Sequence, residues 1–136
     1  MIIISVDLGK ARTGLAISDK TGFLASPLTM IEEKSEKKRL EKVALAVTEN
    51  KAELVVVGLP KNMDGSEGDS AKGAREFASQ LTELTGIKTV MQDERGTTIT
   101  AHNYLSNRDV RGKKRKAAVD IVAASIILQD YLDSHR

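Results

Sequence analysis

The pattern of hydrophobic and polar positions in the first third of the chain is that of short strands. Residues 2–6 form a β-branched run that ends at Asp7-Leu8-Gly9, and this pattern predicts a buried strand. Residues 14–18 form a second strand-like run. Turn-forming residues at 19–22 then lead to a third run over about residues 23–30. Three strands joined by short turns predict an antiparallel meander.

The pattern then changes to alternating helices and strands. Apolar residues at helical spacing predict an amphipathic helix over residues 35–50, and the run Leu54-Val55-Val56-Val57-Gly58 predicts a strand buried in a parallel sheet. A polar loop, a helix, a strand and two further helices are expected in that order at residues 60–69, 71–84, 87–91, 97–105 and about 116–132. The element order predicts an α/β fold in which helices flank a mixed five-stranded sheet.

Length and composition narrow the classes of protein. A chain of 136 residues is expected to form one domain, residues 1–136. It has no cysteine, which excludes disulfide frameworks, Cys-ligated zinc, iron–sulfur clusters and thiol catalysis. The chain begins without the pattern of a signal peptide, and no stretch approaches the length of a membrane span. We therefore expect a cytoplasmic protein without a membrane partner.

Charge is concentrated in one segment. The whole chain carries a net charge of +2, whereas residues 108–116 alone carry +5, which leaves −3 for the remainder. A dense basic segment on a mildly acidic body indicates contact with a polyanion, although a solvated charge run is the simpler alternative. Only four aromatic residues are present, so nucleic-acid binding would depend on charge rather than on base stacking. The candidate binding residues here are Arg111, Lys113, Lys114, Arg115 and Lys116.

Carboxylates stand at three informative positions. Asp7 ends the first strand, where open sheets place their sites, although Asp-x-Gly can also simply form a turn. Asp93 and Glu94 follow the strand at 87–91, and helix capping is the alternative role for them. Asp120 interrupts an otherwise apolar helical stretch, so it needs a partner unless it is an early-turn acid that faces solvent.

These acids can form one site. If the strand that precedes Asp93 lies beside the first strand, Asp7 and Glu94 can converge, and the last helix can bring Asp120 over them. Three acids without His or Cys suit Mg²⁺ or Mn²⁺. Two such ions about 4 Å apart would support cleavage of a phosphodiester bond by water.

Four segments of the chain carry a family resemblance: DLGKARTGLAISD (7–19), VVGLPKNMDGSEG (56–68), DERGTT (93–98) and KKRKAAVDIVAASIILQDYL (113–132). In this order they resemble the YqgF family, also called RuvX, whose members are described as Holliday junction resolvases or nucleases that process precursor ribosomal RNA. The resemblance covers nearly the whole chain. It implies an RNase H-like fold of the RuvC type with strand order 3-2-1-4-5.

The resemblance also implies site residues. It places catalytic, metal-binding acids at Asp7, Glu94 and Asp120, with the choice between Asp93 and Glu94 left open, and it suggests that Arg12, Asn62 and Arg95 line the site. One departure is Gly96, which stands where the family usually has a bulky apolar residue.

The function expected from these residues and this resemblance is a metal-dependent nuclease acting on structured nucleic acid, with the 5′ end of precursor 16S rRNA as the first candidate substrate. The partners would then be structured RNA or branched DNA and a ribosomal precursor particle. Resolution of Holliday junctions by a symmetric dimer is one alternative, so both a monomer and a weak homodimer remain open. A non-catalytic nucleic-acid-binding or ribosome-associated factor is another. An ATPase of the actin and sugar-kinase type, whose phosphate loop is similar to residues 7–14, is a third.

Overall fold

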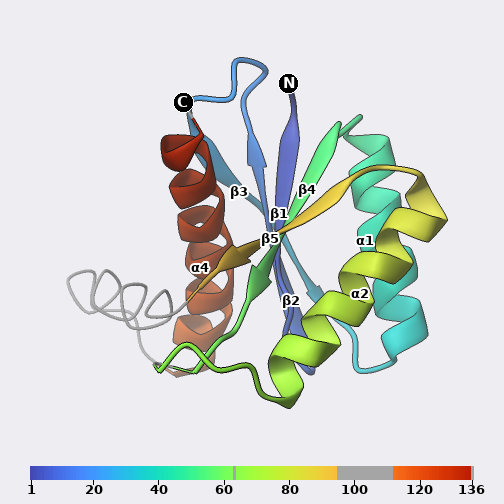
Figure 1. The fold of residues 1–136 in the computed structure, drawn as a ribbon, viewed down its shortest axis with the longest axis vertical. Coiled ribbons are helices and arrows are strands. Elements are labelled where there is room, and N and C mark those ends of the chain that lie inside the picture. The colour runs from blue at the N-terminus through green and yellow to red at the C-terminus, as the bar shows by residue number, and fades with distance from the viewer. Residues whose placement is uncertain (63, 95–111, 136) are drawn as a thin grey trace.

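The computed structural model describes residues 1–62, 64–94 and 112–135 of the chain and gives a sheet covered by helices on both faces (Figure 1). The strands are β1 (Ile3–Asp7), β2 (Arg12–Ser18), β3 (Ala25–Glu32), β4 (Leu54–Leu59) and β5 (Thr89–Asp93). The helices are α1 (Glu36–Glu49), α2 (Asp69–Thr85) and α4 (Gly112–Ser134). The predicted helix over residues 97–105 lies outside the described residues.

The five strands form one mixed sheet in the order β3-β2-β1-β4-β5. β1, β2 and β3 pair antiparallel as the predicted meander, whereas β4 and β5 run parallel to β1. Both the strand order and the fold class predicted from the sequence are confirmed. β1 occupies the centre of the sheet, with β2 on one side and β4 on the other.

The two faces of the sheet pack against different helices (Figure 1). Alternate residues of β1 and β4, such as Ile4 and Val57, join buried side chains of α1 and α2 in one core cluster. The intervening residues, such as Ile3 and Val56, join Ala124, Ile127, Leu128 and Leu132 of α4 in a second cluster. Successive residues of one strand therefore pack in turn against α4 and against the layer formed by α1 and α2.

Two predicted strands begin two residues late because hydrogen bonds keep the preceding residues in turns. Asp19 accepts a hydrogen bond from the Phe23 amide (2.9 Å), and its own amide donates to the Leu24 carbonyl (3.1 Å), so β3 starts only at Ala25. Gly86 ends α2 in a left-handed conformation (φ 73°), and the Ile87 amide then donates to the Thr85 hydroxyl, so β5 starts at Thr89.

The last helix is longer than the apolar pattern predicts. α4 begins by Gly112 and not at about residue 116, so it includes the basic run Lys113–Lys116. Lysine and arginine have good helix propensity, so a helix can include them without an apolar pattern. In contrast, the amphipathic helix predicted over 35–50 matches α1 closely, and the Ser35 side chain caps it by accepting from the Lys38 amide.

Candidate active site

Asp7 lies at the carboxyl end of the central strand, on the face that α4 covers. Its backbone pairs with Gly14 of β2, and it has the same parity as Ile3 and Ser5. Ser5 is fully buried and its hydroxyl donates to the Ala124 carbonyl of α4 (2.6 Å), which shows that this face of the sheet is the one that packs against α4. The strand therefore directs the Asp7 side chain toward the α4 side of the sheet.

Glu94 reaches the same place from β5, although β5 does not adjoin β1. The condition considered from the sequence, that these two strands lie side by side, is not met: β4 separates them, as the strand order 3-2-1-4-5 implies. The intervening position in β4 is Gly58. A Cβ atom there would lie 2.5 Å from Glu94 Oε2 and 2.8 Å from Ile127 Cδ1. Because Gly58 has no side chain, the Glu94 carboxyl group can occupy this space. Asp7 and Glu94 converge across a glycine gap.

The convergence of the two acids changes the protonation of Glu94. Burial, together with the charge of Asp7, a hydrogen bond to the Asp7 carboxylate and the charge of Asp93, raises the pKa of Glu94 to about 8. A hydrogen bond between two carboxyl groups needs a proton on one of them, so Glu94 is the donor and Asp7 the acceptor. At neutral pH the pair shares one proton in the absence of a cation.

Strand parity places Asp93 and Glu94, between which the sequence leaves the choice open, on opposite faces of the sheet. Val90 packs against the α4 cluster and Met91 against the α1–α2 cluster. Continued alternation places Glu94 on the α4 face and Asp93 on the opposite one, where Asp93 is exposed. The amide of Glu94 also donates to the Leu59 carbonyl (3.2 Å), which extends the pairing with β4 through this residue.

Position 120 of α4 lies at the same end of the sheet. The Gln129 side chain bonds the Ala25 amide at the start of β3, and Ala124 accepts from Ser5, so α4 runs antiparallel to β1. From Ser5 to Asp7 the strand advances about 6.6 Å. From Ala124 back to position 120 the helix advances about 6 Å.

This register brings the helix backbone at 120 level with Asp7. Because Asp120 is the ninth residue of α4, the alternative of an early-turn acid is wrong. Side chains of α4 are described from Val122 onward, and that of Asp120 lies outside this range.

Of the other candidate residues, the structure describes the side chains of Arg12 and Asn62, and both have neighbours outside this pair. Arg12 opens β2 and lines a shallow hollow with Glu32, Glu33 and Lys34. Asn62 is exposed, and its amide groups bond Ser66 within the loop between β4 and α2. The residues that lie outside the described chain or its described side chains are Arg95, Gly96, Arg111, Lys113, Lys114, Arg115 and Lys116.

Two residues that shape the site were not singled out from the sequence. Ser5 is a polar residue within an apolar run, and Gly58 is a glycine at the end of an apolar strand. Both interruptions are visible in the sequence. A hydroxyl in a buried strand indicates a specific hydrogen bond, and a glycine in a strand indicates the close approach of another group.

Asp7 and Glu94 are two of the three acids expected to bind a cation, and both belong to the described part of the chain. No group of three or more His, Cys, Asp or Glu side chains able to hold a metal ion occurs among the side chains that the structure describes. The donor chemistry of the pair, two carboxyl groups that share a proton, fits a hard divalent cation.

No helix within the described ranges has the length and apolar character needed to cross a bilayer.

The mixed sheet, its strand order and its acid-bearing central strand define an RNase H-like α/β protein. RuvC from Thermus thermophilus, in complex with Holliday junction substrate, has the same fold with a TM-score of 0.64 at 12% identity, over 98% of this chain and 94% of that one.

Sequence comparison specifies the family. The RuvX family, described as Holliday junction resolvase, matches residues 1–134, and the chain belongs to this family. A protein of Clostridium botulinum (strain Alaska E43) is 43% identical over 98% of this chain and 97% of its own length. One of Lactococcus lactis subsp. cremoris (strain MG1363) is 40% identical over 98% and 94%. Both carry the name "Putative pre-16S rRNA nuclease".

Proposed function

We propose that this protein is a divalent-metal-dependent nuclease that hydrolyses phosphodiester bonds in structured RNA, with precursor 16S rRNA as its substrate. The observation that carries the proposal is the meeting of Asp7 and Glu94 across Gly58. Membership of the RuvX family and the names of its relatives support nuclease chemistry over the ATPase alternative. The names of those relatives favour RNA as the substrate and the cytoplasm as the site of action.

Asp7 and Glu94 would hold the cation, with Asp120 as a third ligand. The raised pKa of Glu94 supports this assignment, because two carboxylates this close need either a proton or a cation between them. When bound, Mg²⁺ or Mn²⁺ activates water and stabilises the leaving oxygen in an in-line displacement at phosphorus. The protein's own contribution would be to hold the three acids at one end of the sheet, with Asp7 at the end of β1, Glu94 directly after β5 and Asp120 on α4.

Binding of the nucleic acid would depend on charge. The basic run Lys113–Lys116 stands in the first turns of α4, one to two turns before position 120, so a phosphate chain bound by this run would pass beside the acids. Arg12 and Arg95 would contact phosphates, and Asn62 would contact the substrate from the loop after β4. We propose that residues 1–136 act as one nuclease domain in this way.

Cleavage of branched DNA is the second candidate function. The description of the RuvX family as Holliday junction resolvase favours it. A carboxylate–metal site cuts RNA and DNA alike, so the acids do not discriminate between the two substrates. Symmetric resolution of a junction requires two sites, and this candidate therefore predicts a homodimer, whereas end processing of RNA is compatible with a monomer.

The decisive experiment compares Asp7→Asn with Asp69→Asn. Asp69 is an exposed acid at the start of α2, the helix that packs on the face of the sheet opposite α4 (Figure 1). Asp7→Asn should lower Mg²⁺-dependent cleavage of a precursor 16S rRNA fragment at least ~100-fold, as for other preorganised charge-stabilising groups, while Asp69→Asn leaves it unchanged. Equal cleavage by wild type and Asp7→Asn would refute the proposed site. A four-way DNA junction assayed in parallel separates the two substrates, and preferential junction cleavage by a dimer would favour the second candidate.

A further inference from the structure

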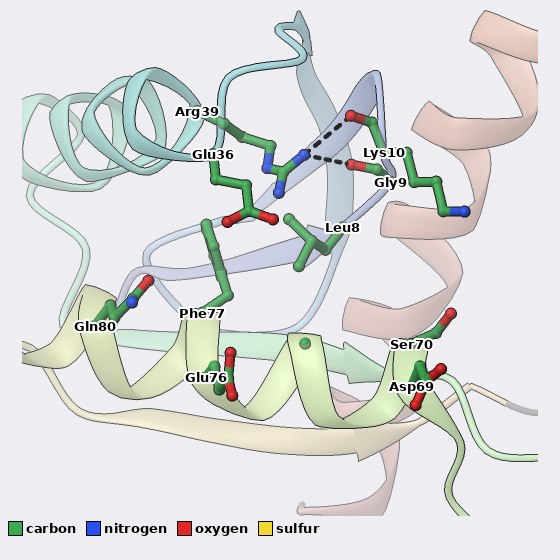
Figure 2. A pocket seen from close by; sticks show the side chains of 11 residues that line it. Leu8, Gly9, Lys10, Glu36, Arg39, Asp69, Ser70, Glu76, Phe77 and Gln80 are labelled. Carbon is green, nitrogen blue, oxygen red and sulfur yellow. Dashed lines mark hydrogen bonds between the residues drawn. The ribbon is translucent and has the colours of Figure 1, made fainter.

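Arg39 is a buried arginine on the face of the sheet opposite the acids. It belongs to α1, where it is only 8% exposed and shares the helix face of Val43 and Val47. Its side chain lines a cavity of about 290 Å³ bounded by α1, α2 and the turn that joins β1 to β2 (Figure 2). Arginine is rarely buried without a specific set of partners, so its contacts indicate why it is there.

The partners of Arg39 are two consecutive carbonyl groups of that turn. Its Nη1 atom donates to the carbonyl oxygens of Gly9 (2.9 Å) and Lys10 (3.1 Å), as Figure 2 shows. No carboxylate lies within ion-pair distance of Arg39 among the residues that the structure describes. Its buried Nε atom also lacks a hydrogen-bond partner among them. The guanidinium group is thus placed to hold the turn, although its Nε–H group forms no hydrogen bond within the described residues.

The turn that Arg39 holds begins directly after Asp7. Asp7 forms the last register pair of β1 with β2, opposite Gly14, and the turn occupies residues 8–11 between the two strands. The turn is tightly folded, because a Cβ atom on Gly9 would overlap the carbonyl oxygen of Arg12. A displacement of the Gly9 carbonyl therefore moves the backbone on both sides of it, toward Asp7 and toward Arg12.

We propose that Arg39 is a positioning residue for the nuclease site: by holding the Gly9 and Lys10 carbonyls, it fixes the turn that carries Asp7 on one side and Arg12 on the other. This inference rests on the proposed function, since it assigns Asp7 to the reaction. Arg39 lies on the face of the sheet opposite Asp7 and Glu94, and it contacts neither of these two acids. A shift of about 1 Å at a reacting group can reduce the rate up to ~100-fold, so a clamp of this kind has a measurable effect on turnover.

The test uses three variants of the full-length protein. Arg39→Met keeps most of the side-chain volume and removes every donor, and Arg39→Lys keeps the charge and a donor. Val47→Ala is the matched control. Val47 is fully buried on the same face of α1, and its apolar side chain cannot form a hydrogen bond with the turn. Amide hydrogen exchange of residues 8–12 and the kcat and KM of RNA cleavage are measured for each, well below the unfolding temperature.

We expect Arg39→Met to speed exchange in residues 8–12 at least tenfold and to lower kcat at least tenfold, with a smaller change in KM. Arg39→Lys should recover part of both effects, and Val47→Ala should reduce thermal stability without either. The proposal is overturned if Arg39→Met exchanges no faster in the turn than Val47→Ala does, or if both variants lose kcat equally. If the wild-type protein cleaves no substrate, the proposed function fails by itself, and the exchange of residues 8–12 still decides whether Arg39 holds the turn.

Discussion

The two faces of one sheet differ in what they place at the carboxyl ends of the same strands. Toward α1 and α2, β1 and β4 present Ile4, Val6, Val55 and Val57, and the cluster continues without a polar side chain from either strand. Toward α4 the same strands present Ile3, Ser5 and Asp7, and Leu54, Val56 and Gly58. On the α4 face, the strands therefore begin with apolar side chains and end with polar side chains or with a glycine.

The difference shows how a small protein separates stability from chemistry. Burial of apolar side chains stabilises a fold, whereas adjacent carboxyl groups oppose it unless they share a proton or a cation. Toward α1 and α2, β1 and β4 supply the first without interruption. The α4 face accepts the second at one end only, next to the Ser5–Ala124 hydrogen bond, whereas Leu128 and Leu132 pack toward the start of the strands.

The sharpest way to break this contrast is to fill the glycine gap. In Gly58→Ala the new Cβ would displace the ends of the Glu94 and Ile127 side chains. Because the groups that must move are flexible, we expect a loss of about 1–3 kcal/mol in unfolding free energy, as in overpacked cores. The moved Glu94 carboxyl should lower kcat at least ~10-fold. Chemical denaturation and single-turnover cleavage measure the two effects.

Gly73→Ala is the matched control on the other side of the sheet. Gly73 lies within α2 with open space around it, so alanine there should stabilise the protein by up to ~1 kcal/mol and leave cleavage within twofold of wild type. If Gly58→Ala behaves as Gly73→Ala does, the glycine gap has no role in placing Glu94.

The pH dependence of stability gives a second contrast. The folded-state pKa of Glu94 is raised from 4.5 to about 8, so the folded protein binds more protons than the unfolded chain between these values. The contribution of Glu94 is complete below pH 4.5 and is lost as the pH rises toward 8. Without divalent ions, unfolding free energy should therefore fall over this window by no more than about 1.4 kcal/mol per pH unit.

Glu94→Gln should remove this slope and be more stable than wild type at pH 8. Glu67→Gln is the control of opposite sign, because the hydrogen bond from Arg75 lowers the pKa of Glu67 and its contribution is lost only as the pH falls below the ordinary range of a glutamate. Urea titrations at pH 3.5, 5, 6.5 and 8 distinguish the variants. An unchanged slope in Glu94→Gln would contradict the shared proton.

The smallest effect concerns two buried hydroxyls on opposite faces. Ser5 donates to Ala124, and Ser5→Ala should cost about 1 kcal/mol of unfolding free energy and reduce cleavage by weakening the register of α4. The Thr13 hydroxyl faces the α1–α2 side and has no hydrogen-bond partner among the described residues. Thr13→Val should be neutral or stabilising, and thermal unfolding of both variants measures the difference. A cost for Thr13→Val as large as that for Ser5→Ala would refute the contrast.

Much of the architecture could be predicted because local patterns determine it. The β-branched run at 2–6, the apolar run at 54–58 and the helical spacing of Val43 and Val47 each correspond to an element of the structure. The ends of elements were less predictable. Turn hydrogen bonds at Asp19 and Thr85 delayed β3 and β5, and a basic run without an apolar pattern proved to be helical.

The sequence by itself determined which chemical groups this protein could use: carboxylates without Cys or His ligands, and a basic run beside them. It also determined the elements that carry these groups, since hydrophobic periodicity is a local property. Only the tertiary structure decided that Gly58 of β4 leaves the gap through which Glu94 reaches Asp7, and that Arg39 holds the turn from the opposite face of the sheet. These contacts join residues about 30 to 90 positions apart in the chain. Such distances are closed by packing and sheet order, which no local pattern specifies.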